Sequence, residues 1–299
     1  MRRGLAYGAG AYVWWGLSPL FWKLLEDVAA IDVVAHRAVW AFVLLALAHT
    51  VRSSWTRLRA VAGDRRNQVV ALCTATLLAT NWGVFLWAVA TDRVLDVSLG
   101  YFINPLMSVV LGVVLLREQM RPAQWVAVGL AAAGVAWFVI EVGSVPLVSL
   151  VLAGTFAVYG LLRKTASFGS VDGLTMETGI MSIGAVLLLA VRAAQGAGTI
   201  GAGAPGQSVL LMLAGGVTAV PLLLFAASAR RVPLSVVGLL QYLAPSIQFV
   251  LGVWVFDETF GRSRLVGFAL IWVALAVLVV DGLRAGSAAD AVPSARPDG

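Results

Sequence analysis

Reactive side chains are scarce in this chain. Its 299 residues include one cysteine, Cys73, and two histidines, His36 and His49. A lone cysteine excludes a disulfide framework within the chain, and this set is too small for a cysteine–histidine zinc centre. No Walker loop or dinucleotide-binding glycine motif occurs, and no Ser–His–Asp set can be paired. We therefore expect no cofactor, no metal site and no enzyme.

Charged residues are also few. They make up only 12% of the chain, against about a quarter in soluble proteins, while 60% of residues are hydrophobic and the mean hydropathy is +0.91. So few charges cannot cover a surface that faces water, and the lipid bilayer is the expected solvent. A net charge of +6 can indicate nucleic-acid binding in a soluble protein. Here the basic residues stand singly or in pairs between apolar runs, so no nucleic-acid partner is expected.

Apolar runs recur along the whole chain, and a helix needs about 20 such residues to cross a bilayer. The first is too long for the apolar core of a cleaved signal peptide, which spans about 7–15 residues, so we predict an uncleaved helix there. The sequence thus predicts an all-α integral membrane protein with ten transmembrane helices. The runs cover approximately residues 4–25, 32–50, 68–90, 97–116, 122–140, 146–162, 173–191, 208–229, 234–256 and 263–281.

The basic residues between these runs predict the orientation, because cytoplasmic loops of membrane proteins are enriched in Lys and Arg. With both termini cytoplasmic, fifteen basic residues face inward and four face outward. This predicts a protein of the bacterial inner membrane. The outer residues are Arg93, Arg192, Arg262 and Arg264. The inner residues are Arg2, Arg3, Arg52, Arg57, Arg59, Arg65, Arg66, Arg117, Arg121, Arg163, Lys164, Arg230, Arg231, Arg284 and Arg296.

The stretch from Asp96 to Glu141 is repeated later in the chain, and a weaker match relates the first span to the sixth. Each half then holds five spans. Because five is odd, the second half enters the membrane in the opposite sense, and inverted halves of this kind suit alternating access. We predict repeats at residues 1–145 and 146–282, followed by a disordered cytoplasmic tail at 283–299. The clearest pairs, which all have the same separation along the chain, are Pro105 with Pro245, Gly112 with Gly252, and Glu118 with Glu258.

Four ionisable side chains are predicted inside or at the ends of spans, where such groups are costly and are functional candidates. Lys23, His36 and Arg37 lie near the outer face, and Glu177 lies near the inner face. Arg37 and Glu177 have the same separation as the repeated pairs, which predicts a cationic gate outside and an anionic gate inside. Snorkelling of Lys23, packing of His36, and structural pairing of Arg37 and Glu177 are the alternative interpretations.

Nearer the midplane, polar and aromatic residues are predicted to line a substrate cavity. The spans of Pro105 and Pro245 are predicted to bend there, because proline removes a backbone hydrogen bond and frees a carbonyl. A kink that serves only packing is the alternative. The predicted lining residues are Trp15, Asn81, Tyr101, Asn104, Tyr159, Gln241 and Tyr242. Glu118 and Glu258, which close their spans, are predicted to tie a helix start or to pair with basic residues.

Several stretches resemble the RarD-like branch of the EamA family, within the drug/metabolite transporter superfamily. The resemblance covers residues 4 to 281 and implies a ten-helix, inverted-repeat carrier of the bacterial inner membrane. It does not specify the substrate or its contacts. The most specific stretch is Ser98-Leu99-Gly100-Tyr101-Phe102-Ile103-Asn104-Pro105-Leu106, and others are Trp15-Gly16, His36-Arg37, Asn81-Trp82, Gln241-Tyr242 and Ile271-Trp272-Val273-Ala274.

The leading functional hypothesis is secondary transport of a small metabolite or drug through a central cavity. Proton coupling through Glu177 or His36, exchange and downhill flux all fit, as do a monomer and a homodimer. A small-solute channel and a non-transporting scaffold or sensor are the alternatives. A channel would call for a ring of like residues or a glycine-rich filter, and a sensor for a substantial soluble domain; none of these features is evident in the sequence.

Overall fold

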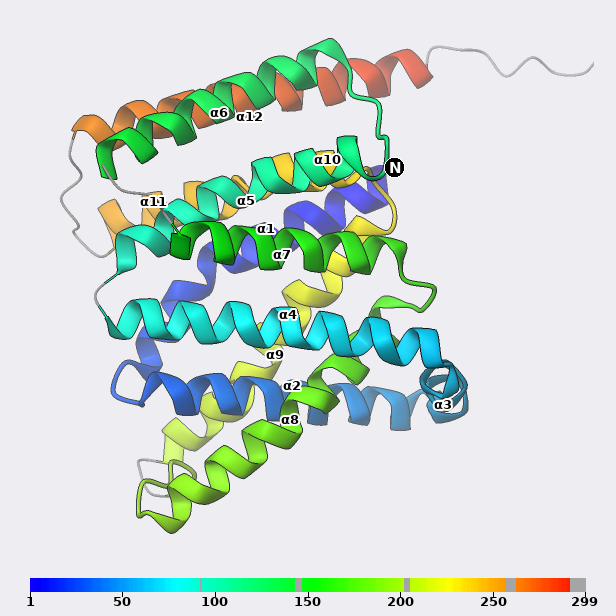
Figure 1. The fold of residues 1–299 in the computed structure, drawn as a ribbon, viewed down its shortest axis with the longest axis vertical. Coiled ribbons are helices and arrows are strands. Elements are labelled where there is room, and N and C mark those ends of the chain that lie inside the picture. The colour runs from blue at the N-terminus through cyan, green and yellow to red at the C-terminus, as the bar shows by residue number, and fades with distance from the viewer. Residues whose placement is uncertain (92, 143–146, 202–204, 256–261, 291–299) are drawn as a thin grey trace, which may run out of the picture.

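The protein folds as a bundle of helices. The computed structural model describes residues 1–91, 93–142, 147–201, 205–255 and 262–290, and within these ranges the regular structure is helical, without a strand (Figure 1). The elements in chain order are α1 (Arg2–Trp22), η1 (Lys23–Leu25), α2 (Ala30–Val51), α3 (Trp55–Gly63), α4 (Arg65–Ala90), α5 (Val94–Val114), α6 (Pro122–Val142), α7 (Leu147–Thr165), α8 (Ser170–Ala194), α9 (Pro205–Ala229), α10 (Leu234–Leu240), α11 (Leu243–Trp254) and α12 (Arg262–Asp290).

Eight segments of the described chain are long and apolar enough to cross a membrane. They coincide with α2, α4, α5, α6, α7, α8, α9 and the combined stretch Leu234–Trp254. Helix α12 contains a shorter apolar segment, Leu265–Asp281, and α1 spans 21 residues without reaching the same apolar level. The all-helical membrane fold is confirmed, and the ten predicted spans match the positions of these helices.

Two elements differ from the sequence prediction. The short helix α3 lies between the second and third predicted spans; its nine residues include Arg57 and Arg59 and bury only Leu58. Helix α12 continues to Asp290, beyond Gly282, where the prediction begins the tail. Residues 291–299 of that tail lie outside the described residues.

The two repeated prolines have different consequences for their helices. Pro105 lies inside the continuous helix α5, whereas the span of Pro245 is divided into α10 and α11. A proline ring clashes with the carbonyl four residues earlier, which for Pro245 belongs to Gln241. That carbonyl instead accepts a hydrogen bond of 3.1 Å from the backbone nitrogen of Ala244. The predicted bend therefore appears as a break in the second span.

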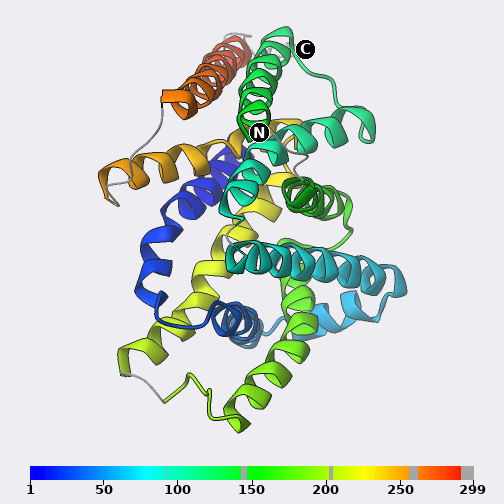
Figure 2. The same cartoon turned by 60° about the vertical axis from the view of Figure 1, so that its left-hand side comes forward.

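Helices of the first half pack mainly against helices of the second (Figures 1 and 2). Helix α1 contacts α9 and α11, while its counterpart α7 contacts α4 and α5; similarly, α2 contacts α9 and α8 contacts α4. The equivalent pairs α2 with α8, α5 with α10, and α6 with α12 contact each other directly. Reciprocal contacts of this kind are consistent with two related halves.

The central pair α5 and α10 crosses closely at a glycine. A side chain at Gly238 would place its Cβ 2.7 Å from the carbonyl oxygen of Pro105 and 2.9 Å from the Cβ of Ser108. Small residues permit such close crossings of membrane helices. The two proline-bearing spans therefore meet at the middle of the bundle.

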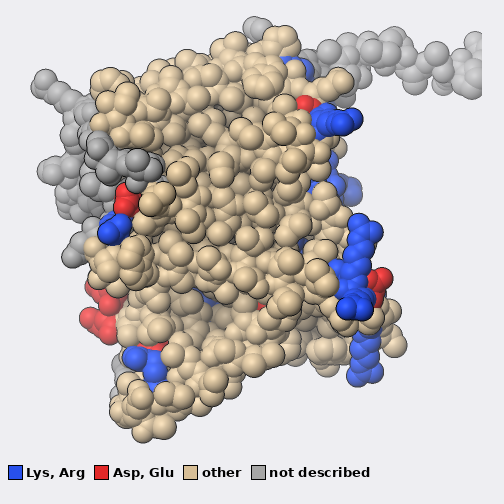
Figure 3. Space-filling model, in the orientation of Figure 1, with Lys and Arg blue, Asp and Glu red and all other residues tan. Residues whose placement is uncertain are grey.

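Basic side chains gather at one edge of the molecule. Figure 3 shows Lys and Arg concentrated along the edge at which Figure 1 places the N-terminus and α3, with fewer at the opposite edge. The broad area between the two edges carries almost no charge. An apolar belt between two charged ends fits a protein that crosses the bilayer.

Candidate functional site

Arg37 occupies an aromatic sandwich inside the bundle. Its guanidinium carbon lies 4.4 Å from the ring centroid of Trp82 and 4.9 Å from that of Trp22. Its Nε donates a hydrogen bond of 2.9 Å to the hydroxyl of Thr218. Helices α1, α2, α4 and α9 supply these four residues, and Tyr101 of α5 lies within electrostatic range of the guanidinium. Both halves of the chain thus build the site.

The outer fork of this guanidinium has no partner. Nη1 and Nη2 of Arg37 have no hydrogen-bond partner among the described residues. Arg37 is half-buried, and Tyr101 is 47% exposed. The Arg37 site is therefore less enclosed than a fully buried one.

Glu177 lies in the opposite environment, fully buried between α7 and α8. One oxygen accepts a hydrogen bond of 3.2 Å from Nη1 of Arg163, and the other accepts one of 3.2 Å from the hydroxyl of Tyr159. The side chains of Arg163 and Glu177 are 1% and 0% exposed. The predicted anionic gate is therefore an ion pair sealed inside the protein.

The surroundings of Arg163 are shaped to hold it. Its Nη2 donates to the carbonyl of Ser170 at 3.0 Å, and its guanidinium carbon lies 5.6 Å from the ring centroid of Phe168. A Cβ at Gly173 would overlap both Nη1 of Arg163 and the Phe168 ring. Glycine at this position therefore makes room for the ion pair.

The sequence analysis counts Arg163 with the basic residues between spans, whereas the structure places it inside α7 with a buried side chain. The residue precedes Lys164 at the end of an apolar run, which gives it the appearance of a loop residue. Tyr159 and Arg163 are four residues apart and share one face of α7, which is the sequence signal that could have found the pair.

Arg230 lies beside this centre, just beyond the end of α9. Its Nη1 donates to the carbonyl of Ala166 at 2.9 Å and also to that of Phe168. Burial, followed by the positive charges of Arg163 and Arg231, lowers the pKa of the Arg230 guanidinium. Arg230 therefore fastens the segment between α7 and α8 that covers Arg163.

Polar contacts hold α8 against α2 at one end and against α2 and α3 at the other. At one end Arg192 binds Asp32 through two hydrogen bonds, with Nη2 2.9 Å from Oδ2. At the other end Arg57 lies 3.2 Å from Asp172, and His49 lies 3.8 Å from the same carboxylate. Asp32 and Asp172 occupy equivalent positions of the repeat. Sequence reasoning missed both as site residues, although their spacing marks them as a repeated pair.

His36 makes its hydrogen bond outside the Arg37 sandwich. Its Nε2 lies 2.8 Å from the hydroxyl of Thr199, and the side chain is buried. Lys23 lies in η1 with an exposed side chain, directly after Trp22 of the sandwich.

The predicted midplane residues divide between an aromatic cluster and polar ties. Trp15 and Tyr159 pack with Tyr12, Phe156 and Phe225, whose ring centroids lie 5.1 to 6.3 Å apart in the contacting pairs. This cluster fills the core between α1, α7 and α9.

The polar residues of the predicted cavity mostly tie helices together. Asn81 donates to the Leu152 carbonyl and to Thr155, both at 2.9 Å. Gln241 donates to Ser108 at 3.2 Å, and the Tyr242 hydroxyl donates to the Phe102 carbonyl at 3.1 Å. The side-chain oxygen of Asn104 is buried without a partner among the described residues. Asn104 therefore keeps a buried acceptor that no described residue satisfies.

Glu118 fastens the start of α10. Its carboxylate accepts hydrogen bonds from the backbone nitrogens of Leu234 and Ser235 at 2.6 and 2.9 Å, and from the Ser235 hydroxyl at 2.8 Å. It also lies 3.5 Å from Nζ of Lys164. The expected pairing with a basic residue across the bundle is present, but the helix start that Glu118 ties is that of α10, not that of the following helix α6. Its counterpart Glu258 lies outside the described residues.

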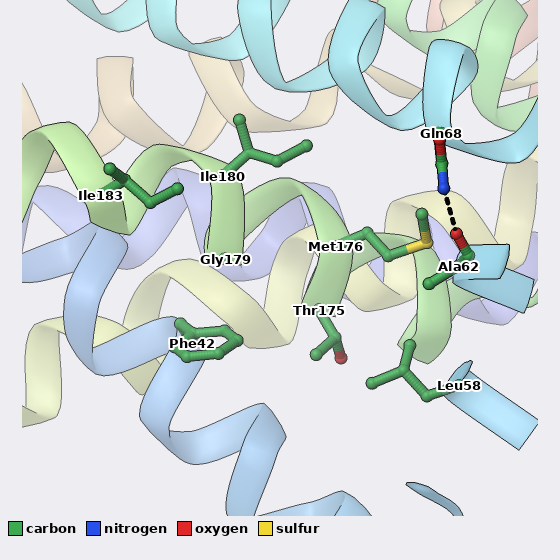
Figure 4. Close-up of a pocket in the computed structure, with 9 residues that line it drawn as sticks. All are labelled: Phe42, Leu58, Ala62, Gln68, Thr175, Met176, Gly179, Ile180 and Ile183. Atoms are coloured by element: carbon green, nitrogen blue, oxygen red, sulfur yellow. Dashed lines mark hydrogen bonds between the residues drawn. The ribbon is translucent and has the colours of Figure 1, made fainter. Parts of the chain in front are cut away.

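A surface groove of about 370 Å³ lies between α2, α3, α4 and α8 (Figure 4). Apolar side chains line most of it, and Gln68 donates across one end to the carbonyl of Ala62 at 2.7 Å. Arg37 and Glu177 are not among its lining residues. Within the part of the chain that the structure describes, no three His, Cys, Asp or Glu side chains group as metal ligands would.

A helical membrane bundle that holds charged side chains inside it is the architecture of a membrane transport protein. Residues 2–140 match the EamA-like transporter family. Protein RarD of Streptomyces exfoliatus is 44% identical over 283 residues, which cover 95% of this chain and 90% of that protein. The uncharacterized transporter YojE of Bacillus subtilis is 43% identical over 280 residues, 92% of each chain. The chain belongs to the EamA-like transporter family, which confirms the family resemblance seen in the sequence.

A more distant relative and one solved structure agree. The chloramphenicol-sensitive protein RarD of Pseudomonas aeruginosa is 30% identical over 289 residues, covering 94% of this chain and 95% of that protein. A crystal structure at 18% identity superimposes with a TM-score of 0.71, over 93% of this chain and 97% of that one, and shows the fold alone. The chain is thus a multi-pass membrane protein of a transporter family, which accords with the expectation that it is not an enzyme.

Proposed function

We propose that the protein is a secondary transporter that moves a small metabolite or drug by alternating access between two inverted five-helix halves, residues 1–145 and 146–282. One observation carries the proposal: Arg37 and Glu177, which occupy equivalent positions of the repeat, have unlike environments. Arg37 is half-buried and its terminal nitrogens have no partner among the described residues, whereas Glu177 is fully buried against Arg163 and Tyr159. A carrier in one of its two states has one end open and the other end closed.

The helix contacts support a path between the halves. Each helix of the reciprocal pairs contacts its partners across the boundary between residues 1–145 and 146–282. The aromatic cluster of Tyr12, Trp15, Phe156, Tyr159 and Phe225 stands between α1, α7 and α9, on the same boundary. A solute that enters at Arg37 therefore meets a closed core, which favours a carrier over an open channel.

For orientation, we propose that both termini face the cytoplasm of a bacterial cell. The basic edge in Figure 3 supports this, because cytoplasmic ends of membrane helices are rich in Lys and Arg. Reporter domains fused after Arg59 and after Arg192 test it. We expect the first in the cytoplasm and the second outside, and finding both on one side would contradict the ten-span topology.

Coupling of transport to a proton gradient through Glu177 depends on whether its carboxylate can leave Arg163 and bind a proton. Because its carboxylate already holds Arg163, protonation of Glu177 requires the pair to separate first. Proton-coupled transport through Glu177 or His36 therefore predicts uptake that follows an imposed pH gradient. Exchange or downhill flux predicts uptake that follows the solute gradient alone.

The test is uptake and efflux in proteoliposomes loaded with the full-length protein. Amino acids, nucleotide precursors, sugar phosphates and antibiotics form the first panel. We expect Arg37→Ala to abolish transport while insertion is unchanged, and Arg93→Ala, on an exposed arginine above Trp87, to transport normally. Normal transport by both Arg37→Ala and Glu177→Ala would show that neither residue is a gate.

A further inference from the structure

Arg37 differs from the other arginines held inside the bundle. Arg163 pairs with Glu177, and Arg192 pairs with Asp32. Arg37 has no carboxylate partner among the described residues, and its only hydrogen bond is to the neutral hydroxyl of Thr218. A guanidinium stays charged at any physiological pH, so the positive charge at this position has no protein counter-ion.

The rings around Arg37 partly replace that counter-ion. Trp82 and Trp22 both lie within cation–π range of the guanidinium carbon, at 4.4 and 4.9 Å. Aromatic faces hold the cation without neutralising it. They leave the edge of the guanidinium unpaired, because its Nη1 and Nη2 have no hydrogen-bond partner among the described residues.

The free edge has a defined chemical preference. Two parallel N–H donors in one plane match the two oxygens of a carboxylate, which they bind bidentately. Rings that hold the guanidinium restrict its rotation, so the fork is already oriented for a ligand. One guanidinium neutralises one negative charge, which favours a monoanion over a dianionic phosphate.

We propose that Arg37 binds the carboxylate of the transported solute, and that the substrate class is small organic monocarboxylates. The inference rests on the proposed transport function, since the solute supplies the missing counter-ion as it enters the open end. It commits Arg37 to a binding contact rather than to a gate that opens and closes.

Matched pairs of ligands test the proposal. The purified full-length protein is titrated with small carboxylic acids from acetate to indole-3-acetate, each beside its amide, and with inorganic phosphate. Thermal unfolding in detergent reports binding, and uptake by proteoliposomes reports transport. We expect at least one acid to raise the unfolding midpoint, its amide to have no effect, and phosphate to bind at least tenfold more weakly.

Variants connect the effect to Arg37. We expect Arg37→Gln to weaken acid binding at least tenfold and Arg37→Lys to retain part of it, because lysine keeps the charge but loses the fork. Arg93→Gln removes another arginine that stacks on a tryptophan, 5.1 Å above Trp87, and should bind like the wild type. Size-exclusion profiles show that each variant is folded.

The proposal would be overturned if no acid shifted the unfolding midpoint of the wild-type protein. It would also be overturned if an amide shifted that midpoint as much as its acid did, or if the acid shifted the midpoint of Arg37→Gln as much as that of the wild type. The readouts also separate the two proposals. Acid binding without uptake would support the carboxylate site and contradict transport. Uptake that is equal for acid and amide, and equal for the wild type and Arg37→Gln, would support transport and contradict the carboxylate site.

Discussion

Asp32 and Asp172 lie in the first turns of α2 and α8, and each binds an arginine. Asp32 binds Arg192 in the last turn of α8, while Asp172 binds Arg57 of α3, the short helix that follows α2. Both ion pairs are present in the same structure. Because α2 and α8 come from different halves, the two pairs join the halves at the end of the bundle farthest from α6 and α12 (Figure 1).

Neutralising one of these pairs should weaken the molecule modestly. Asp32 is 2% exposed and Arg192 28%, so solvent screens the pair in part. We expect the double-mutant cycle of Asp32→Asn and Arg192→Gln to show a small favourable coupling in unfolding. Chemical unfolding in mixed micelles measures it. Effects that are simply additive would show that the two residues do not stabilise each other.

Breaking the buried pair at the other centre should cost far more. Glu177→Gln leaves the charge of Arg163 unpaired in a fully buried site, and we expect a loss of about 3–5 kcal/mol in unfolding free energy. The double variant Glu177→Leu/Arg163→Met should recover much of that loss yet fail to transport. Glu26→Gln, on an exposed carboxylate, is the matched control. Equal stability of Glu177→Gln and the control would mean that the pair does not stabilise the protein.

Gly173 should not tolerate even one methyl group. A Cβ there would overlap the Arg163 guanidinium and the Phe168 ring, so we expect Gly173→Ala to lose about 1–3 kcal/mol. Gly184→Ala in the same helix meets nothing within 4 Å and should be neutral or stabilising, since alanine favours helices. Thermal unfolding of the two variants side by side measures the difference. Matching midpoints would contradict the packing described around Arg163.

Glu118 should stabilise the start of α10. Glu118→Ala removes three hydrogen bonds to Leu234 and Ser235, and we expect a loss of about 1–2 kcal/mol, similar to the loss of a strong helix cap. Ser235→Ala removes only one of the three and should cost less. Hydrogen exchange at the amide of Leu234 reports the effect locally. Unchanged exchange in Glu118→Ala would rule out the cap.

The spans of the bundle follow from apolar length, and the sequence therefore predicts their positions closely. Helix α3 escapes such a prediction because its nine residues, with two arginines among them, are too few to cross a bilayer. The burial of Arg37 and Glu177 also follows from their positions within apolar runs. Their partners do not, because Trp22 and Arg163 reach them only through the tilt and rotation of neighbouring helices, which no periodicity encodes.

Some predicted residues have other roles in the structure. Asn81, Gln241 and Tyr242 are occupied by hydrogen bonds to neighbouring helices. Polar residues in a span can hold helices together as well as bind a solute, and sequence does not separate the two uses. His36 likewise contacts Thr199, on the segment that follows α8, and so joins two parts of the chain.

The backbone differs around the two repeated prolines, because α5 is continuous at Pro105 and the other span is broken before Pro245. Pro105 and Pro245 each lack the N–H that would satisfy the carbonyl four residues earlier, which belongs to Tyr101 in α5 and to Gln241 before α11. Gln241 regains a donor from Ala244 through the break, while α5 stays unbroken. If the two halves exchange conformations during transport, the carbonyl that lacks its helical donor changes from Tyr101 to Gln241. Isotope-labelled carbonyls at Tyr101 and Gln241 would then change their infrared frequencies in opposite directions during one transport cycle.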